Sequence, residues 1–199
     1  MTSGDDPGNP TLSTPRLLLR RPCADDLPRF VTLFAPLAVV RHTLTFPHPY
    51  TIDDGRAFLE RTAAAQEKGE SFNFCILLRD DAASAPVVVG SIGLMVSATH
   101  RHAELGYTLG QDYWGRGIAT EAARAVVSFG FALGLERIHA GCATTNPGSV
   151  RVLEKLGFVR EGLRERMYYR FGEWMDLALY RMFREDWPAA PDARAVRSG

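Results

Sequence analysis

The sequence predicts a mixed α+β fold in which helices cover both faces of one central sheet. Two observations carry this prediction. The apolar residues change from helical to alternating spacing near Gly69, and the second half then alternates strands with helices before two closing strands. A chain of 199 residues is long enough for one such domain. We expect this domain at 14–187, between flexible tails at 1–13 and 188–199 that lack apolar periodicity.

The first third of the chain is expected to be mainly helical after a short strand at 16–20. Asp25 or Asp26 can cap a helix that carries apolar residues at helical spacing through Phe34. Two prolines make 43–50 a loop. A capping box that begins at Thr51 then opens a helix that continues to about Lys68.

The rest of the chain is expected to build most of the sheet. Alternating or continuous apolar runs predict three antiparallel strands at 72–78, 87–96 and 103–109. A helix at 117–133 follows, because its apolar residues share one face. Asn146 and Pro147 are typical of a helix start and open a short helix to Leu156. The remaining strands are expected at 138–144, 158–163 and 173–182.

Composition excludes several classes of function. Lys and Arg together number 23, as do Asp and Glu, so the formal charge is zero and argues against general nucleic-acid binding. No apolar run is long enough to span a bilayer, and the polar start is unlike a signal peptide. The cysteines are scattered, and no His/Cys cluster has metal-ligand spacing. These features predict a cytoplasmic protein with no metal, nucleic-acid or membrane partner.

The most informative segment joins a strand to a helix through a turn that contains Gly115 and Gly117. Such a junction directs free backbone N–H groups and the positive end of the helix dipole at one point, where a phosphate can bind. The P-loop pattern fails because no Gly-Lys pair follows, and the dinucleotide fingerprint fails because Thr120 occupies its third glycine position. A plain strand–turn–helix connection is the alternative.

A second motif, at Asn146, Ser149, Lys155, Gly157 and Phe158, follows the next strand. Together with Trp114-Gly-Arg-Gly-Ile-Ala119, it resembles the Gcn5-related N-acetyltransferase (GNAT) superfamily, in particular the RimJ/RimL-type branch of ribosomal-protein N-terminal acetyltransferases. The resemblance covers about residues 14–184. It implies a mostly antiparallel sheet in which two parallel strands splay apart.

The resemblance also implies where acetyl-CoA lies, in the gap between the strands that end near Leu109 and Thr144. Backbone groups of one wall would pair with the pantetheine arm, and Asn146 would contact it from the other. The first wall comprises Tyr107, Thr108 and Leu109, and the pyrophosphate would lie on Trp114, Gly115, Arg116, Gly117, Ile118, Ala119 and Thr120. Asn146 can equally act as a helix cap, and Arg116 as a solvated loop residue.

Amide formation requires a neutral amine, so a base must remove its proton. Glu104 begins the strand whose far end would hold the cofactor and can take this role, although a water chain, His100 or His102 could serve instead. A backbone N–H near Leu109 would stabilise the developing oxyanion.

The departing thiolate benefits from a proton donor, although a thiol leaves tolerably without one. Much of the superfamily supplies this donor as a tyrosine four residues after the Ser/Ala position. Here that residue is Leu153. Ser149 is then the nearest hydroxyl, unless it only satisfies the start of its helix. Tyr168 and Tyr169 are further alternatives.

We therefore expect an acetyl-CoA-dependent N-acetyltransferase that acts by direct attack in a ternary complex, as a monomer or homodimer. The preferred acceptor is a protein or peptide N-terminal amine. A small amine (an antibiotic, polyamine or amino-acid derivative) and a non-catalytic acyl-CoA-binding module are the alternatives. Charged residues near the closing strands could orient the acceptor or form a solvated face: Glu161, Arg164, Glu165, Arg166, Arg170 and Arg181.

Overall fold

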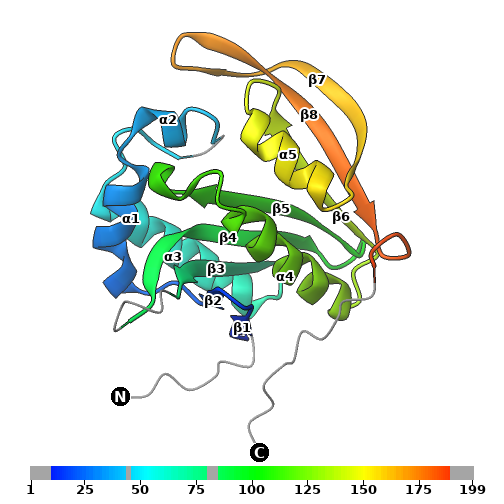
Figure 1. The fold of residues 1–199 in the computed structure, drawn as a ribbon, viewed down its shortest axis with the longest axis horizontal. Helices are drawn as coiled ribbons and strands as arrows, with labels where there is room; N and C mark the ends of the chain where they lie inside the picture. The colour runs from blue at the N-terminus through cyan, green and yellow to red at the C-terminus, as the bar shows by residue number, and fades with distance from the viewer. Residues whose placement is uncertain (1–9, 44–45, 80–84, 189–199) are drawn as a thin grey trace, which may run out of the picture.

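The computed structural model describes residues 10–43, 46–79 and 85–188, which form one sheet with helices on both faces (Figure 1). The strands are β1 (Leu12–Ser13), β2 (Leu17–Arg20), β3 (Ser71–Leu78), β4 (Val87–Ser97), β5 (His102–Leu109), β6 (Arg137–Ala143), β7 (Val159–Arg170) and β8 (Glu173–Phe183). The helices are α1 (Leu27–Phe34), α2 (Leu37–Val40), α3 (Ile52–Glu67), α4 (Ile118–Ala132) and α5 (Pro147–Lys155). The mixed α+β prediction is confirmed.

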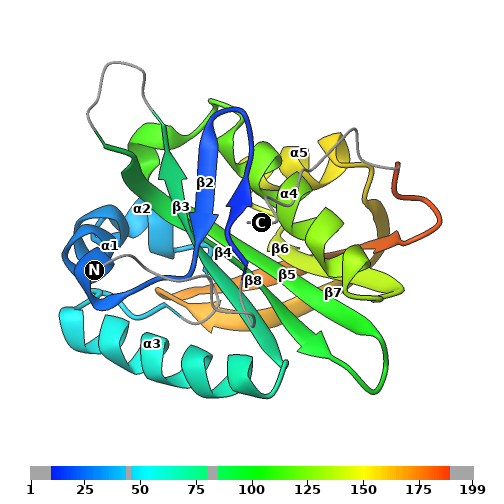
Figure 2. The same ribbon diagram turned by 90° about the horizontal axis from the view of Figure 1, so that it is seen from below.

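The sheet separates two apolar cores. Its order is β1-β2-β3-β4-β5-β6-β8-β7, and all neighbours are antiparallel except β5 and β6. Helices α1 and α3 pack on one face, whereas α4 and α5 lie on the other (Figures 1 and 2). Phe30 and Phe34 of α1 belong to the first core, and Ile118 and Val126 of α4 belong to the second.

The N-terminal boundary differs from the expected one. Leu12 and Ser13 lie within the expected tail, yet they pair with β2, where Leu12 packs against the core. The other tail residues, 1–9 and 189–199, lie outside the described residues, as do residues 44–45 of the expected loop.

Local signals placed α1 and α3 correctly, but they did not predict α2 and they misassigned one carboxylate. The capping box at the start of α3 is confirmed, because Thr51 and Asp54 exchange hydrogen bonds. Asp26, by contrast, does not cap α1 with its side chain. It is 4% exposed and accepts two hydrogen bonds from Arg20, at 2.7 and 2.8 Å, and one from the Cys23 N–H. A buried carboxylate needs such a cation, so the Asp26 side chain is directed to Arg20 and to the start of the preceding 3-10 turn (Ala24–Asp26) instead of to the start of α1.

The parallel strands β5 and β6 are joined along only part of their length. Three residue pairs hold them together, and the last of these is Glu104 with His139. Beyond it, β5 continues to Leu109 beside β4, and β6 continues to Ala143 beside β8. The two strands therefore diverge, with unpaired edges that face each other. This confirms the expected splay and places the gap between Leu109 and the start of α5.

The closing hairpin is longer than expected. Strand β7 continues to Arg170, whereas the alternation of the sequence ended at Leu163. The reason is irregular pairing between β7 and β8, which shifts register twice and breaks the alternation. The tip of the hairpin touches the segment between α2 and α3, where Arg170 donates a hydrogen bond of 2.6 Å to the Phe46 carbonyl.

Candidate active site

The loop between β5 and α4 has the geometry of an anion site. Gly115 and Gly117 have φ values of +72° and +77°, in the left-handed region that favours glycine. Gly117 is the N-cap of α4. Among the described residues, no hydrogen bond uses the N–H of Gly115, Arg116 or Gly117. The first-turn N–H groups of α4 are likewise without intrahelical partners. Several donors thus converge at the positive end of the helix dipole.

Of the side chains of this loop, Trp114 anchors it and Arg116 is exposed. The Trp114 indole donates a hydrogen bond of 3.0 Å to the Leu109 carbonyl, which ties the loop to the end of β5. The Arg116 guanidinium is 5.7 Å from the centre of the Tyr113 ring. It is exposed, so it is free to meet either a phosphate or solvent.

Across the gap, the start of α5 presents Asn146 and Ser149. The Asn146 side chain accepts a hydrogen bond from the Ser149 N–H at 3.1 Å, which confirms its role as a helix cap. The Ser149 hydroxyl lies 2.8 Å from the phenol of Tyr107 on β5. Burial raises the pKa of Tyr107, although the Ser149 hydrogen bond partly offsets this, so the phenol stays protonated. A two-hydroxyl bridge therefore spans the gap.

Sequence reasoning used only the backbone of Tyr107 and missed this bridge. Alternation along β5 was the available signal, because it places Tyr107 on the same side as the buried Leu105 and Leu109. Leu153 is only 1% exposed and packs in the core between α4, α5 and the sheet. Tyr169 is exposed, whereas Tyr168 reaches a cavity on the other side of the gap.

That cavity has a volume of about 330 Å³ and lies between β5, β6 and the closing hairpin. Its ionisable lining comes from all four strands of this region. Glu104 and His139 face it from the last parallel pair of β5 and β6. The other polar groups include His102, Arg137, Glu161 and Arg164. The cavity thus begins where the two strands part, so a group lying in the gap can meet a group bound in the cavity.

Carboxylate, imidazole and guanidinium side chains lie together in the cavity. The rings of His102 and His139 are 5.2 Å apart between centroids. Burial lowers the pKa of His139, and the Glu104 carboxylate only partly opposes this, so the imidazole is mostly neutral near pH 7. Glu161 pairs with Arg137. Arg164 makes no ion pair with any described residue and is available to an anionic group.

His100 and His102, the alternative bases that the sequence suggested, differ in their surroundings. His100 is exposed, which fits the simple interpretation of a loop histidine, but His102 is half-buried and lines the cavity. No motif singles out His139, although buried Ile138 and Ala140 on either side place it on the opposite face of β6. Of the charged residues near the closing strands, Glu161 and Arg164 line the cavity.

Neither a metal-binding cluster nor a membrane-spanning helix occurs among the described residues. These residues contain no group of three His, Cys, Asp or Glu side chains placed to hold a metal ion. None of their helices is long and apolar enough to cross a membrane.

Comparisons with known proteins agree with this geometry. The family model described as the acetyltransferase (GNAT) domain matches residues 16–159. The uncharacterized N-acetyltransferase YoaA of Bacillus subtilis (strain 168) is 33% identical over 173 residues, which cover 86% of this chain and 95% of YoaA. The ribosomal protein uS5 alanine N-acetyltransferase of Escherichia coli (strain K12) is 27% identical over 122 residues, or 61% of this chain and 62% of that protein.

Among solved structures, Mycobacterium smegmatis RimJ in complex with CoA-disulfide matches the fold with a TM-score of 0.77 and 23% identity, covering 87% of this chain and 85% of RimJ. The RimJ match shows a shared fold, and the uS5 match supports the resemblance to the RimJ/RimL-like branch. Since the family model covers most of the chain and YoaA matches it almost end to end, the chain belongs to the GNAT family of N-acetyltransferases.

Proposed function

We propose that this protein transfers an acetyl group from acetyl-CoA to a primary amine, and that the acceptor is the N-terminal amine of a protein or peptide. One observation carries the proposal: β5 and β6 part immediately after Glu104 and His139. The gap between the two strands connects the β5–α4 loop, with its free N–H donors, to the cavity that contains the Glu104 carboxylate. An acyl donor held by its phosphates and an amine held in the cavity would meet there.

The donor fits the residues present. The pyrophosphate would accept hydrogen bonds from the N–H groups of 115–120, where the absence of side chains at Gly115 and Gly117 lets oxygens approach the backbone. The unpaired edge of β5 at 107–109 would pair with the amide groups of the pantetheine arm, with Asn146 on the far side. The thioester then supplies the activated acetyl group.

Glu104 is the proposed base. Its carboxylate would accept the proton of the bound ammonium, and the neutral nitrogen would then attack the thioester carbonyl in a ternary complex. His139 and His102 lie beside it and can pass that proton to solvent. A backbone N–H near Leu109 would stabilise the charge that develops on the carbonyl oxygen.

Ser149 is the proposed donor to the departing sulfur. When the carbon–sulfur bond breaks, the Ser149 hydroxyl would transfer its proton to the thiolate, and the Tyr107 phenol would replace that proton on the Ser149 oxygen. Solvent would return a proton to the phenol once CoA has left. This pair would replace the tyrosine that many relatives carry where this chain has the buried Leu153. A thiol is a tolerable leaving group, so this contribution is smaller than that of the base.

The choice of acceptor rests on the relatives and on the cavity. A relative of 27% identity is named for acetylation of a ribosomal protein's alanine. In this chain the cavity lies beside the β7–β8 hairpin. Strand β7 is the last strand of the sheet, so one of its edges pairs with no other strand of the described residues. An extended N-terminal segment could lie along such an edge and place its amine in the cavity.

Mass spectrometry tests the proposal. The full chain is incubated with acetyl-CoA and two peptides of one lysine-containing sequence, the first with a free and the second with a blocked N-terminus. We expect acetylation of the first peptide at its terminus and none of the second. Acetylation of polyamines or amino-acid derivatives alone would contradict the protein acceptor. CoA binding without transfer to any amine would support the non-catalytic module instead.

A further inference from the structure

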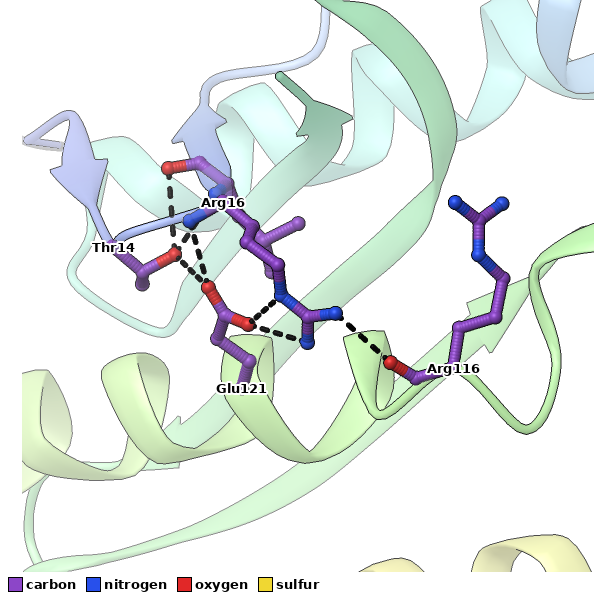
Figure 3. A network of polar contacts seen from close by, with 5 residues as sticks. Thr14, Arg16, Arg116 and Glu121 are labelled. Atoms are coloured by element: carbon purple, nitrogen blue, oxygen red, sulfur yellow. Dashed lines mark hydrogen bonds and ion pairs between the residues drawn. The ribbon is translucent and has the colours of Figure 1, made fainter. Parts of the chain in front are cut away.

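One side chain outside the two motifs is built into the phosphate loop. Arg16 lies just before β2, about one hundred positions from the loop, and its Nη1 donates a hydrogen bond of 3.0 Å to the Arg116 carbonyl. Figure 3 shows that the Arg116 side chain extends away from this contact, so only its backbone is held. Gly115 and Gly117, the left-handed residues of the loop, flank the held residue.

The same guanidinium also binds Glu121 in the first turn of α4. Its Nε and Nη2 each lie 2.7 Å from Oε2, and the Arg16 backbone N–H donates to Oε1 at 3.0 Å (Figure 3). Thr14 adds a hydroxyl donor at 2.6 Å. Burial by itself would raise the pKa of Glu121, but the hydrogen bonds from Thr14 and Arg16 outweigh it and lower the pKa. Glu121 is therefore ionised at neutral pH.

These contacts have two consequences for an anion at the loop. An ionised carboxylate in the first turn of α4 would repel a diphosphate, and the fork of Arg16 neutralises it. In addition, the carbonyl of Arg116 and the N–H of Gly117 belong to one planar trans peptide and point in opposite directions. Holding the carbonyl therefore holds the N–H toward the opposite side, although the flanking glycines would otherwise let this peptide turn.

We propose that Arg16 is a positioning residue for the diphosphate of CoA: it orients the Gly117 N–H through the Arg116 carbonyl and cancels the charge of Glu121. The inference rests on the proposed binding of acetyl-CoA at this loop. It assigns a functional role to the segment before β2, which is separate in sequence from both motifs.

Arg16→Met is the test, and Arg79→Met is its matched control. Arg79 holds the same N-terminal segment, through hydrogen bonds of 2.8 Å to the Thr14 carbonyl and 2.8 Å to the Ser13 hydroxyl, but makes no contact with the loop. By calorimetry, we expect Arg16→Met to weaken CoA binding by about 10- to 100-fold, the loss typical of charge-assisted hydrogen bonds. Arg79→Met should bind CoA like the wild type.

Steady-state kinetics separate positioning from a general loss of structure. With an amine acceptor, Arg16→Met should raise the KM for acetyl-CoA by the same factor and leave kcat nearly unchanged. With S-acetyl-pantetheine, which lacks the diphosphate, its kcat/KM should equal that of the wild type. Equal losses with both donors, or equal losses of CoA affinity in Arg16→Met and Arg79→Met, would overturn the inference.

Arg16→Lys covers the case in which Arg16→Met does not fold. Lysine keeps the charge opposite Glu121 but lacks the planar fork that reaches both the carboxylate and the Arg116 carbonyl. We expect a smaller but clear loss of CoA affinity, and wild-type affinity would overturn the orienting role. If the wild type itself does not bind CoA, the proposed function fails; if it binds CoA and the Arg16 variants bind it equally well, only this inference fails.

Discussion

Replacing Gly117 by valine tests the phosphate loop at its most constrained point. Gly117 has φ of +77° and ψ of 1°, a conformation that β-branched residues strongly disfavour. Forcing valine into it costs roughly 1–3 kcal/mol of folding free energy. The added Cβ would lie 3.4 Å from Nη2 of Arg16, the side chain that holds the Arg116 carbonyl. We expect the loop to open, or its N–H groups to be covered, so that CoA binding is abolished.

The other end of the same helix offers a control for the strain. Gly134 follows α4, has φ of +89°, and would place a Cβ in open space. Gly134→Val should therefore lose similar stability, with a fall in Tm of roughly 2–12 °C, while it keeps its CoA affinity. Calorimetric titration with CoA and thermal unfolding monitored by circular dichroism measure the two effects separately. A folded Gly117→Val protein that binds CoA as well as the wild type would refute the assignment of the pyrophosphate to this loop.

Three further predictions concern the base, the hydroxyl bridge and the buried ion pair. Glu104→Gln should lower kcat by about 10²–10⁴-fold and leave CoA affinity unchanged. Activity within about twofold of wild type would give the role of base to water or histidine. Ser149→Ala should slow acetyl transfer and Tyr107→Phe should slow it less, both with unchanged CoA affinity; a fully active Ser149→Ala removes Ser149 from the mechanism. Asp26→Asn should cost about 3 kcal/mol in urea unfolding at pH 7. The folded pKa of Asp26 lies below its usual value, so its contribution to the free energy of unfolding is present above about pH 4 and is lost as pH falls through the folded pKa. The difference in stability between Asp26→Asn and wild type should therefore shrink in acid. A pH-independent difference would contradict the ion pair with Arg20.

Local signals predicted the parts of the site that are local in sequence. The strand–turn–helix at Gly115 and Gly117 and the cap at Asn146 follow from neighbouring residues, and the structure confirms both geometries. The splay of β5 and β6 came from the resemblance, because no pattern within either strand shows where two strands cease to pair.

Contacts between distant elements could not be predicted in this way. The bridge of Tyr107 and Ser149 joins a strand to a helix 42 positions away, and the contact of Arg16 with Glu121 joins residues 105 positions apart. Such pairs depend on the sheet order, which places β2 and β5 relative to α4 and α5. The face of β6 on which His139 lies could be predicted from the alternation of buried residues. Its position beside Glu104 could not, because it depends on the register of the parallel strands β5 and β6.

The buried position of Leu153 changes how the missing tyrosine should be tested. Leu153→Tyr on a Ser149→Ala background would restore the pattern of many relatives. In this chain, however, the Leu153 side chain is 1% exposed within the core. A phenol there would overpack the core and leave its hydroxyl without a partner. Tyr107→Phe is therefore the more informative variant for proton donation to the sulfur.

A crystal structure of the protein with CoA would test the central claim most directly. The account predicts that the diphosphate lies within hydrogen-bond distance of the backbone N–H groups of 115–120. It also predicts that the pantetheine arm runs between β5 and β6. The sulfur should lie near Ser149 on one side and face the cavity of Glu104 on the other. A diphosphate bound elsewhere, with the gap between β5 and β6 left closed by Tyr107 and Ser149, would contradict the account.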